Sequence, residues 1–219
     1  DMAKIPRTTA KTINLGLFYG MGKLKLEKEL NLSKKEANLL FNTYHKKVPF
    51  VKLLSQTLIT FAEEHKLLYT LGDRFCRFNK WETRDRKWND DIKRFEPVPI
   101  LTEEEAKTAF KAELLEKYNG KVVDNYMKDF KYNYKPAFTY KALNRLIQGS
   151  AADMTKKAMV QLYERGILPQ IQIHDELCLS VKGDKEKETI KNVMEKSLPL
   201  LIKNKVNCLT GSSWGDCKK

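Results

Sequence analysis

Long apolar runs are absent from this 219-residue sequence: no stretch approaches the roughly 18 consecutive apolar residues that a membrane-spanning helix needs. The four cysteines (Cys76, Cys178, Cys208 and Cys217) include no CxxC pair and no spacing typical of zinc ligands. Internal repeats are also lacking. These absences argue against a membrane-spanning protein and against a zinc-binding module. We interpret the cysteines as reduced thiols, which predicts a reducing compartment.

Acidic residues are too few to balance the basic ones. The sequence has 28 Asp and Glu against 41 Lys and Arg, for a formal net charge of +13. Hydrophobic residues make up 42% and charged residues 32%, a composition typical of folded protein. The positive excess predicts a polyanionic partner, above all nucleic acid, although a ribosomal or a membrane-surface protein would share it.

One stretch, residues 6–20, reads as a helix that begins at a proline and ends at Gly20. Arg7, Lys11, Leu15 and Tyr19 recur every fourth residue in it and therefore share one face. A phosphate chain could lie along the two cations while a sugar and a base meet the apolar half. The alternative is an ordinary basic amphipathic helix that exposes its Arg and Lys.

A second stretch, residues 171–181, alternates apolar and polar residues around His174, Asp175 and Glu176. Alternation is typical of half-buried strands, so we predict a β-hairpin with two carboxylates at its turn. Carboxylate oxygens suit Mg²⁺, which usually takes one or two of them together with substrate phosphates. The alternative is a solvated acidic turn.

These two stretches, with residues 144–153 between them, resemble three motifs of the family A DNA polymerases, the DNA polymerase I family and its bacteriophage relatives. Residues 7–20 resemble the fingers-helix motif Arg-x₃-Lys-x₃-(Phe/Tyr)-x₃-Tyr-Gly, although Leu15 stands where the family usually has Phe or Tyr. Residues 174–176 resemble the palm motif His-Asp-Glu. Residues 144–153 resemble the long palm helix.

The resemblance implies an α+β fold: a helical fingers subdomain and the C-terminal part of an antiparallel-sheet palm with a long packing helix. The expected divisions are fingers (1–67, with the nucleotide-binding helix at 6–20), a hairpin (68–78), a partly helical insertion (79–135) and a palm portion (136–219, with the catalytic hairpin at 170–181). The final residues, 206–215, resemble the family's terminal strand. Within this frame we expect helices at 23–30, 33–46, 50–66, 102–117, 122–130, 139–164 and 184–197.

The implied function is template-directed DNA synthesis, in which a primer 3′-OH attacks a dNTP. By resemblance, Arg7 binds the outer phosphates, Lys11 neutralises charge at the α- and β-phosphates, Leu15 packs near the sugar and Tyr19 stacks near the templating base. Asp175 and Glu176 are the implied ligands for two Mg²⁺ ions. The residues implied to contact primer–template DNA are Gly20, Arg74, Asn144, Gln148 and His174.

One expected metal ligand, an Asp in an upstream palm motif, has no counterpart before Arg7. We therefore expect the chain to be the C-terminal portion of a polymerase, to need the N-terminal portion as a segment or a separate subunit, and to be inactive alone. Its expected location is the cytoplasm or nucleoid, or the host cytoplasm if the source is a virus, and no membrane partner is expected.

The insertion at 79–135 lies outside the resemblance. Its charges nearly cancel, so it is not mainly a DNA-binding tail. We expect a small folded unit, either a docking surface for an accessory protein or for the rest of the polymerase, or a decoration that packs on its own domain. Six aromatic residues are expected to form its core: Trp81, Trp88, Phe95, Phe110, Tyr118 and Phe130.

Two other functions stay open. A single-subunit RNA polymerase has a similar fingers helix, but it typically carries Ser after the palm His-Asp, where this sequence has Glu176. A non-enzymatic, basic nucleic-acid-binding module would also account for the net charge.

Overall fold

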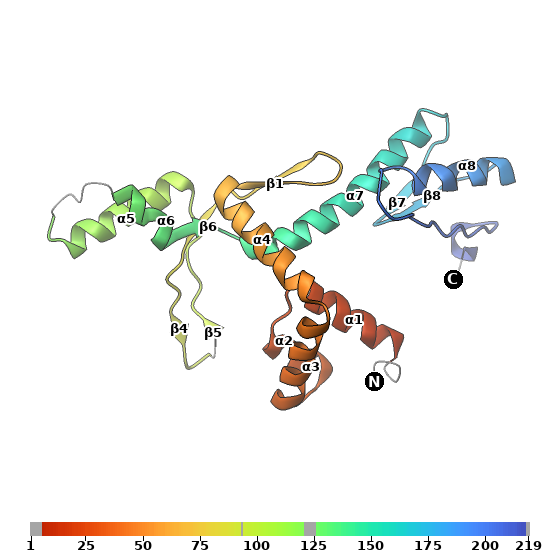
Figure 1. Cartoon of the computed structure of the whole chain (residues 1–219). Helices are drawn as coiled ribbons and strands as arrows, with labels where there is room; N and C mark the ends of the chain where they lie inside the picture. The colour runs from red at the N-terminus through yellow and green to blue at the C-terminus, as the bar shows by residue number, and fades with distance from the viewer. Residues whose placement is uncertain (1–5, 93, 121–125, 218–219) are drawn as a thin grey trace. The chain divides into compact units, whose positions relative to one another are not determined.

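The computed structural model describes residues 6–92, 94–120 and 126–217 (Figure 1). It confirms the predicted α+β class: helices dominate, and the described strands form four separate two-stranded sheets. The chain forms two compact units, Asp1–Leu68 with Arg77–Leu143, and Tyr69–Cys76 with Asn144–Lys219. The predicted limits of fingers, hairpin, insertion and palm portions stay a prediction.

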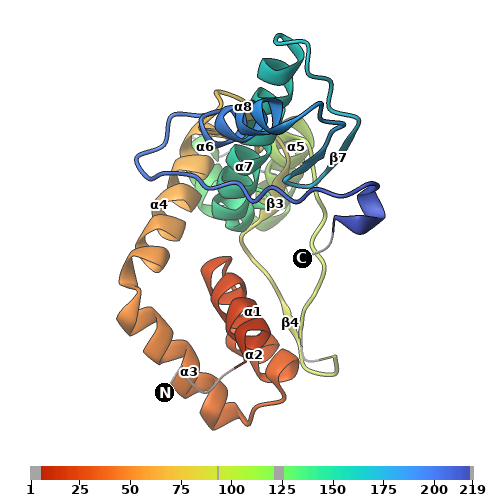
Figure 2. The same cartoon turned by 90° about the vertical axis from the view of Figure 1, so that its right-hand side faces the viewer.

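Four helices open the first unit close to their predicted positions. The third begins with the capping box expected from its sequence, in which the Glu36 amide donates to the Ser33 hydroxyl and the Ser33 amide donates to the Glu36 carboxylate. Pro49 occupies the first turn of the fourth, where its missing N–H costs nothing, and the chain bends there (Figure 2). The helices are α1 (Arg7–Phe18), α2 (Lys23–Leu30), α3 (Lys34–Lys47) and α4 (Pro49–His65).

A buried apolar cluster joins α1, α2 and α3. Ile13 and Leu17 of α1 pack with Leu26 of α2 and Tyr44 of α3. The Tyr44 hydroxyl donates to Asn14 Oδ1 at 3.2 Å, so a polar contact adds direction to the packing. The inward side of α1 is thereby fixed, and with it the side that faces solvent.

The two ends of the insertion are held together by two paired strands that lie about fifty residues apart in the chain. β3 (Trp81–Thr83) pairs antiparallel with β6 (Tyr134–Pro136), with Trp81 opposite Pro136. Between them, α5 (Glu103–Lys117) begins at the Thr102 and Glu105 capping box. Of the helix predicted at 122–130, residues 121–125 lie outside the described part, and α6 spans Tyr126–Asn133.

Three of the six aromatic residues expected in the insertion core are buried there. Trp81, Phe110 and Phe130 form a cluster with Tyr134 and Ala106. The Phe130 and Tyr134 rings stack with centroids 5.4 Å apart. This cluster packs α5 and α6 against β3 and β6, which makes the insertion a folded part of the first unit.

The expectation was wrong for the other three aromatic residues. Trp88, Phe95 and Tyr118 are 46%, 49% and 45% exposed. Trp88 and Phe95 face each other across an unpredicted ribbon of β4 (Trp88–Asn89) and β5 (Arg94–Phe95), with ring centroids 5.1 Å apart. No further described strand pairs with this ribbon, so the two rings shield mainly each other.

The second unit is built around one long helix. β1 (Leu67–Tyr69) and β2 (Phe75–Arg77) form the predicted hairpin, whose tip belongs to this unit. A 3₁₀ turn, Thr139–Lys141, leads into α7 (Ala142–Tyr163). The predicted carboxylate hairpin follows as β7 (Ile171–Ile173) and β8 (Glu176–Cys178), and then α8 (Asp184–Glu195), whose Ile190 and Val193 pack with Leu162 and Ile167.

The strand predicted at 206–215 is wrong. This segment is irregular up to a 3₁₀ turn at Trp214–Asp216. The Asp216 carboxylate accepts hydrogen bonds from the Ser213 amide and from the hydroxyls of Ser212 and Ser213, which favours the tight turn. No strand of the described residues runs beside it to complete a ladder.

None of the helices in residues 6–92, 94–120 and 126–217 combines the length and the apolar character that crossing a bilayer requires.

Candidate functional site

The face of α1 singled out from its spacing points away from the core. Arg7, Lys11 and Leu15 are exposed, and Ile13 and Leu17 are buried on the other side of the helix. The helix therefore presents two cations one turn apart, followed by an apolar side chain that is 45% exposed. A polyphosphate with an attached nucleoside would find complementary groups along this ridge.

The C-terminal end of α1 carries an aromatic residue, Tyr19, and then Gly20, whose backbone conformation favours glycine. Tyr19 is half-buried and packs edge-on against Phe18, with ring centroids 5.4 Å apart. Gly20 has φ of +84°, a left-handed conformation that other residues adopt only at a cost. Gly20 is also exposed, so its backbone can be approached closely from outside.

The turn between β7 and β8 displays the predicted carboxylates. Ile173 pairs with Glu176 across the hairpin, which leaves His174 and Asp175 as a two-residue turn. All three polar residues of this His-Asp-Glu run are exposed. His174 has φ of +53°, and its carbonyl accepts a hydrogen bond from the Gln172 side chain, which supports the turn.

The donor set at this turn fits a magnesium ion that is shared with a substrate. Among the residues the structure describes, no group of three or more His, Cys, Asp or Glu could hold a metal ion by itself. Mg²⁺ commonly takes only one or two protein carboxylates and completes its shell with water and phosphate oxygens. Asp175 and Glu176 are adjacent, exposed and of the right chemistry for such a partial site.

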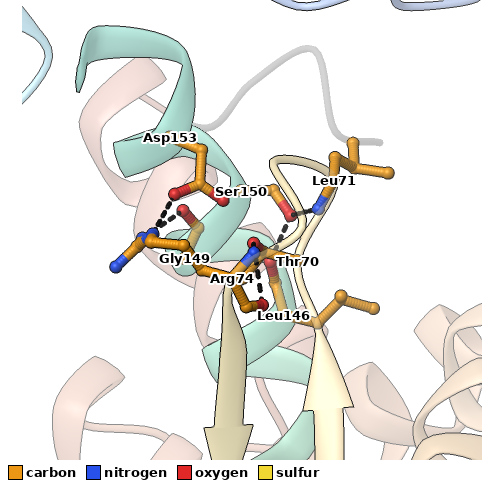
Figure 3. Close-up of polar contacts among 7 residues, drawn as sticks. All are labelled: Thr70, Leu71, Arg74, Leu146, Gly149, Ser150 and Asp153. Atoms are coloured by element: carbon orange, nitrogen blue, oxygen red, sulfur yellow. Dashed lines mark hydrogen bonds and ion pairs between the residues drawn. The ribbon is translucent and has the colours of Figure 1, made fainter. Parts of the chain in front are cut away.

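The tip of the β1–β2 hairpin lies against α7, where it is held by Arg74 (Figure 3). The Arg74 Nε donates to Asp153 Oδ1, and its Nη2 donates to the Gly149 carbonyl at 3.1 Å. The Leu71 amide donates to the Ser150 hydroxyl at 3.0 Å. Arg74 is thus fixed at two points on the helix and keeps 48% of its side chain exposed.

Two glycines allow this close approach. A Cβ on Gly72 would lie 2.6 Å from both Cβ and Cγ of Asp153, and one on Gly149 would lie 2.7 Å from Thr70 Cγ2. Neither glycine has a positive φ, so glycine is needed at both positions because it has no side chain, and not because of its backbone conformation. The tip and the helix meet at a distance that only glycine permits.

Asp153 is the buried acidic group of this contact, with 3% of its surface exposed. Burial acts to raise the pKa of its carboxyl, but the Thr70 hydroxyl, the Arg74 guanidinium and the Gly72 amide together hold the pKa below its ordinary value. Its Oδ2 is buried without a hydrogen-bond partner among the described residues. The charged partner of the carboxylate is Arg74, which donates to its other oxygen, Oδ1.

The exposed face of α7 carries the other two residues expected to contact DNA. Asn144 and Gln148 are both exposed and one turn apart. Gln148 directly precedes Gly149, whose carbonyl holds Arg74. The sequence did not predict that Asp153, Thr70 and Ser150 hold the hairpin tip against α7. The one signal available for them was the position of Asp153 at the end of the palm-helix motif.

The predicted residues divide between the two units. Arg7 and Lys11 belong to the first and Asp175 to the second, so the joint dNTP and metal site that the resemblance implies stays a prediction. Within the second unit, the structure brings Arg74 onto α7 beside the Gln148 position.

Residues 1–216 match DNA polymerase family A. The DNA-directed DNA polymerase of Pseudomonas phage M6 is 30% identical over 249 residues, which cover 98% of this chain and 30% of that protein. The DNA polymerase I of Synechocystis sp. is 29% identical over 229 residues, which cover 100% of this chain and 20% of that protein. Each relative is therefore several times longer than the matched region.

Among solved structures, the POL domain of Pol1 from M. smegmatis, in a complex with DNA primer-template and dNTP, has a similar fold. The TM-score is 0.61 and the sequence identity 20%, over 99% of this chain and 32% of that one.

Proposed function

Because the chain belongs to DNA polymerase family A, we propose that it forms part of a template-directed DNA polymerase that adds dNTPs to a primer 3′-OH. The family match carries the proposal, since it spans both the α1 ridge and the β7–β8 turn. The exposure of the ridge and of the turn supports it, because each group would have to meet a substrate.

The proposed chemistry is phosphoryl transfer: the primer 3′-OH forms a bond to the α-phosphorus and pyrophosphate leaves. The protein has little covalent work in such a reaction and acts by positioning and by neutralising charge. Arg7 suits the outer phosphates because its guanidinium can donate two parallel hydrogen bonds. Lys11, one turn further along, would neutralise charge nearer the reacting phosphorus. Leu15 would pack on the sugar and Tyr19 near the templating base.

We propose that Asp175 and Glu176 hold two Mg²⁺ ions together with a carboxylate from outside residues 1–219. When bound, these ions would stabilise the charge on the attacking and leaving oxygens. The chain spans 20 to 30% of the relatives described above, which leaves ample sequence in such a protein for the further carboxylate. The N-terminal portion of the polymerase, in the same chain or as a subunit, is therefore a proposed partner and a condition for activity.

The proposed contacts with primer–template follow from exposed polar groups. Asn144 and Gln148 would donate to minor-groove acceptors, purine N3 and pyrimidine O2, which occupy similar places in all correct pairs. Arg74 would contact a backbone phosphate, His174 the primer terminus, and Gly20 would let template backbone pass. The minor-groove contacts of Asn144 and Gln148 would therefore test whether a base pair has the correct shape, and they would not distinguish one sequence from another.

The test is primer extension by the protein purified from its source with whatever partner it carries. We expect extension with dNTPs and little with NTPs. Asp175→Asn should abolish extension while primer–template affinity is retained, because only the metal ligand is lost. Asp184→Asn, at an exposed carboxylate of the same unit, is the matched control and should extend normally. Normal extension by Asp175→Asn would refute the assignment, and a preference for NTPs would indicate an RNA polymerase.

A further inference from the structure

The two partners of the ion pair between α7 and the hairpin tip differ greatly in solvent exposure. The Asp153 side chain is 3% exposed and the Arg74 side chain 48%. Asp153 therefore has no direct access to a ligand, whereas the guanidinium that it holds is open on its outer side. Whatever Asp153 does for a ligand, it must do through Arg74.

The second anchor restricts the guanidinium further. Nε is directed to the Asp153 carboxylate and Nη2 to the Gly149 carbonyl (Figure 3). Two donors of one planar group bound at two points leave little freedom of rotation about the last bonds of the side chain. A free arginine would lose that freedom on binding a ligand, at a cost to affinity.

The backbone around Arg74 is fixed by the same helix. The Thr70 hydroxyl accepts from the Arg74 amide at 3.2 Å and donates to the Arg74 carbonyl at 3.1 Å. Thr70 in turn lies against Gly149, and Gly72 against Asp153. The position of the guanidinium is thus set from both its ends, by contacts of which Asp153 supplies the only charged one.

We propose that Asp153 is a positioning residue that holds the Arg74 guanidinium ready to contact the primer–template duplex. The inference rests on the proposed function, because it needs DNA as the ligand of Arg74. It adds a role for a buried acidic residue whose own charge would repel the phosphates that Arg74 attracts.

A purely structural role for the pair makes a different prediction, and a double-mutant cycle separates the two. Asp153→Asn and Arg74→Gln each break the pair, and Arg74→Gln leaves a buried carboxylate without its charged partner. The double variant removes both charges, so its thermal stability should recover relative to Arg74→Gln. If the pair only stabilises the fold, DNA affinity should recover with it.

If Asp153 positions Arg74, DNA affinity should not recover. We expect Arg74→Gln to raise the Kd for a fluorescent hairpin DNA with a recessed 3′ end about tenfold, as for loss of one charge-assisted hydrogen bond. Asp153→Asn should raise it several-fold, and the double variant should match Arg74→Gln. The slope of log K against log salt concentration should become shallower by about 0.9 in Arg74→Gln, because this variant neutralises one phosphate fewer.

The matched control is Glu82→Gln in the first unit. Glu82 is a similarly buried carboxylate, 9% exposed in its side chain, paired with Lys135 at 3.5 Å. It should alter thermal stability and leave the DNA Kd unchanged. Gly72→Ala is a second variant, which presses the tip away from Asp153 and should weaken DNA binding without changing any charge.

Three results would overturn the inference. They are unchanged or tighter DNA binding by Asp153→Asn, affinity that recovers together with stability in the double variant, and unchanged binding by Arg74→Gln. Each leaves the extension assay with Asp175→Asn intact as a test of the polymerase assignment. If the wild-type protein, purified with whatever partner it carries, neither binds nor extends the duplex, the proposed function and this inference fall together.

Discussion

The contact between Gly149 of α7 and Thr70 of the hairpin tip allows a quantitative test of the packing. An alanine Cβ at position 149 would lie 2.7 Å from Thr70 Cγ2, whereas ordinary contact begins at 3.4 Å. The Thr70 methyl cannot simply swing away, because its hydroxyl is held at both the Arg74 amide and the Arg74 carbonyl. Gly149→Ala must therefore shift the tip or the helix.

Two opposing effects set the size of the change. Overpacking of this kind costs about 1–3 kcal/mol, while replacing Gly by Ala inside a helix stabilises it by about 0.8–1.0 kcal/mol. We expect Gly149→Ala to lower the free energy of unfolding by about 1 kcal/mol, within the range these two estimates allow. Thr70→Ser alone should cost about 0.8 kcal/mol for the buried methyl group that it removes.

The informative variant is the double one. Without Cγ2, the nearest Thr70 atom to the new methyl group is Cβ at 3.9 Å, and serine keeps the hydroxyl. The double variant should therefore be about 1–3 kcal/mol more stable than the sum of the single changes predicts. Urea unfolding followed by circular dichroism would measure this coupling.

Ala151→Gly, at an exposed position of the same helix, is the control for helix propensity and should cost about 0.8–1.0 kcal/mol. If the Gly149 and Thr70 changes add to within about 0.5 kcal/mol, the tip does not lie against α7 as described.

Three further predictions concern other parts of the chain. Leu15→Phe on the α1 ridge should raise the rate of dNTP incorporation and change selectivity against dideoxynucleotides; identical values for both would count against a sugar contact at this position. Because the folded-state pKa of Asp153 lies below its ordinary value of 3.8, the stability gained from its ionised form is present above that pH and is lost as the pH falls through the lowered value. The loss of stability in Asp153→Asn should accordingly be largest near neutral pH and shrink in acid, as followed by unfolding at a series of pH values; a constant difference would exclude the linkage. Ser33→Ala should remove both hydrogen bonds that the Ser33 hydroxyl makes at the start of α3 and cost about 1 kcal/mol, or about 2–4 °C in Tm; an unchanged Tm in a thermal scan would show that this hydroxyl contributes nothing.

Local chemistry made most of the helices predictable. The beginnings of α3 and α5 are specified by Ser33 with Glu36 and by Thr102 with Glu105, which lie within one turn of each other. The outward face of α1 also follows locally, because Ile13 and Leu17 occupy the side opposite Arg7 and Lys11.

What escaped prediction depends on partners far apart in the chain. β3 and β6 are too short to be recognised before they pair. The aromatic residues of the insertion look alike in the sequence, yet Phe110 is buried and Trp88 exposed, because only the tertiary arrangement supplies the cover. Asp153 and Arg74 are separated by 79 residues, and no periodicity connects them.

The pairing of β3 with β6 has an evolutionary consequence. Because Thr83 stands opposite Tyr134, the chain leaves the surrounding framework and returns to it at neighbouring points. A segment attached in this way can be gained, trimmed or exchanged by a lineage without rethreading the elements on either side. We therefore expect relatives of this chain to differ mainly in the length and content of the segment between β3 and β6.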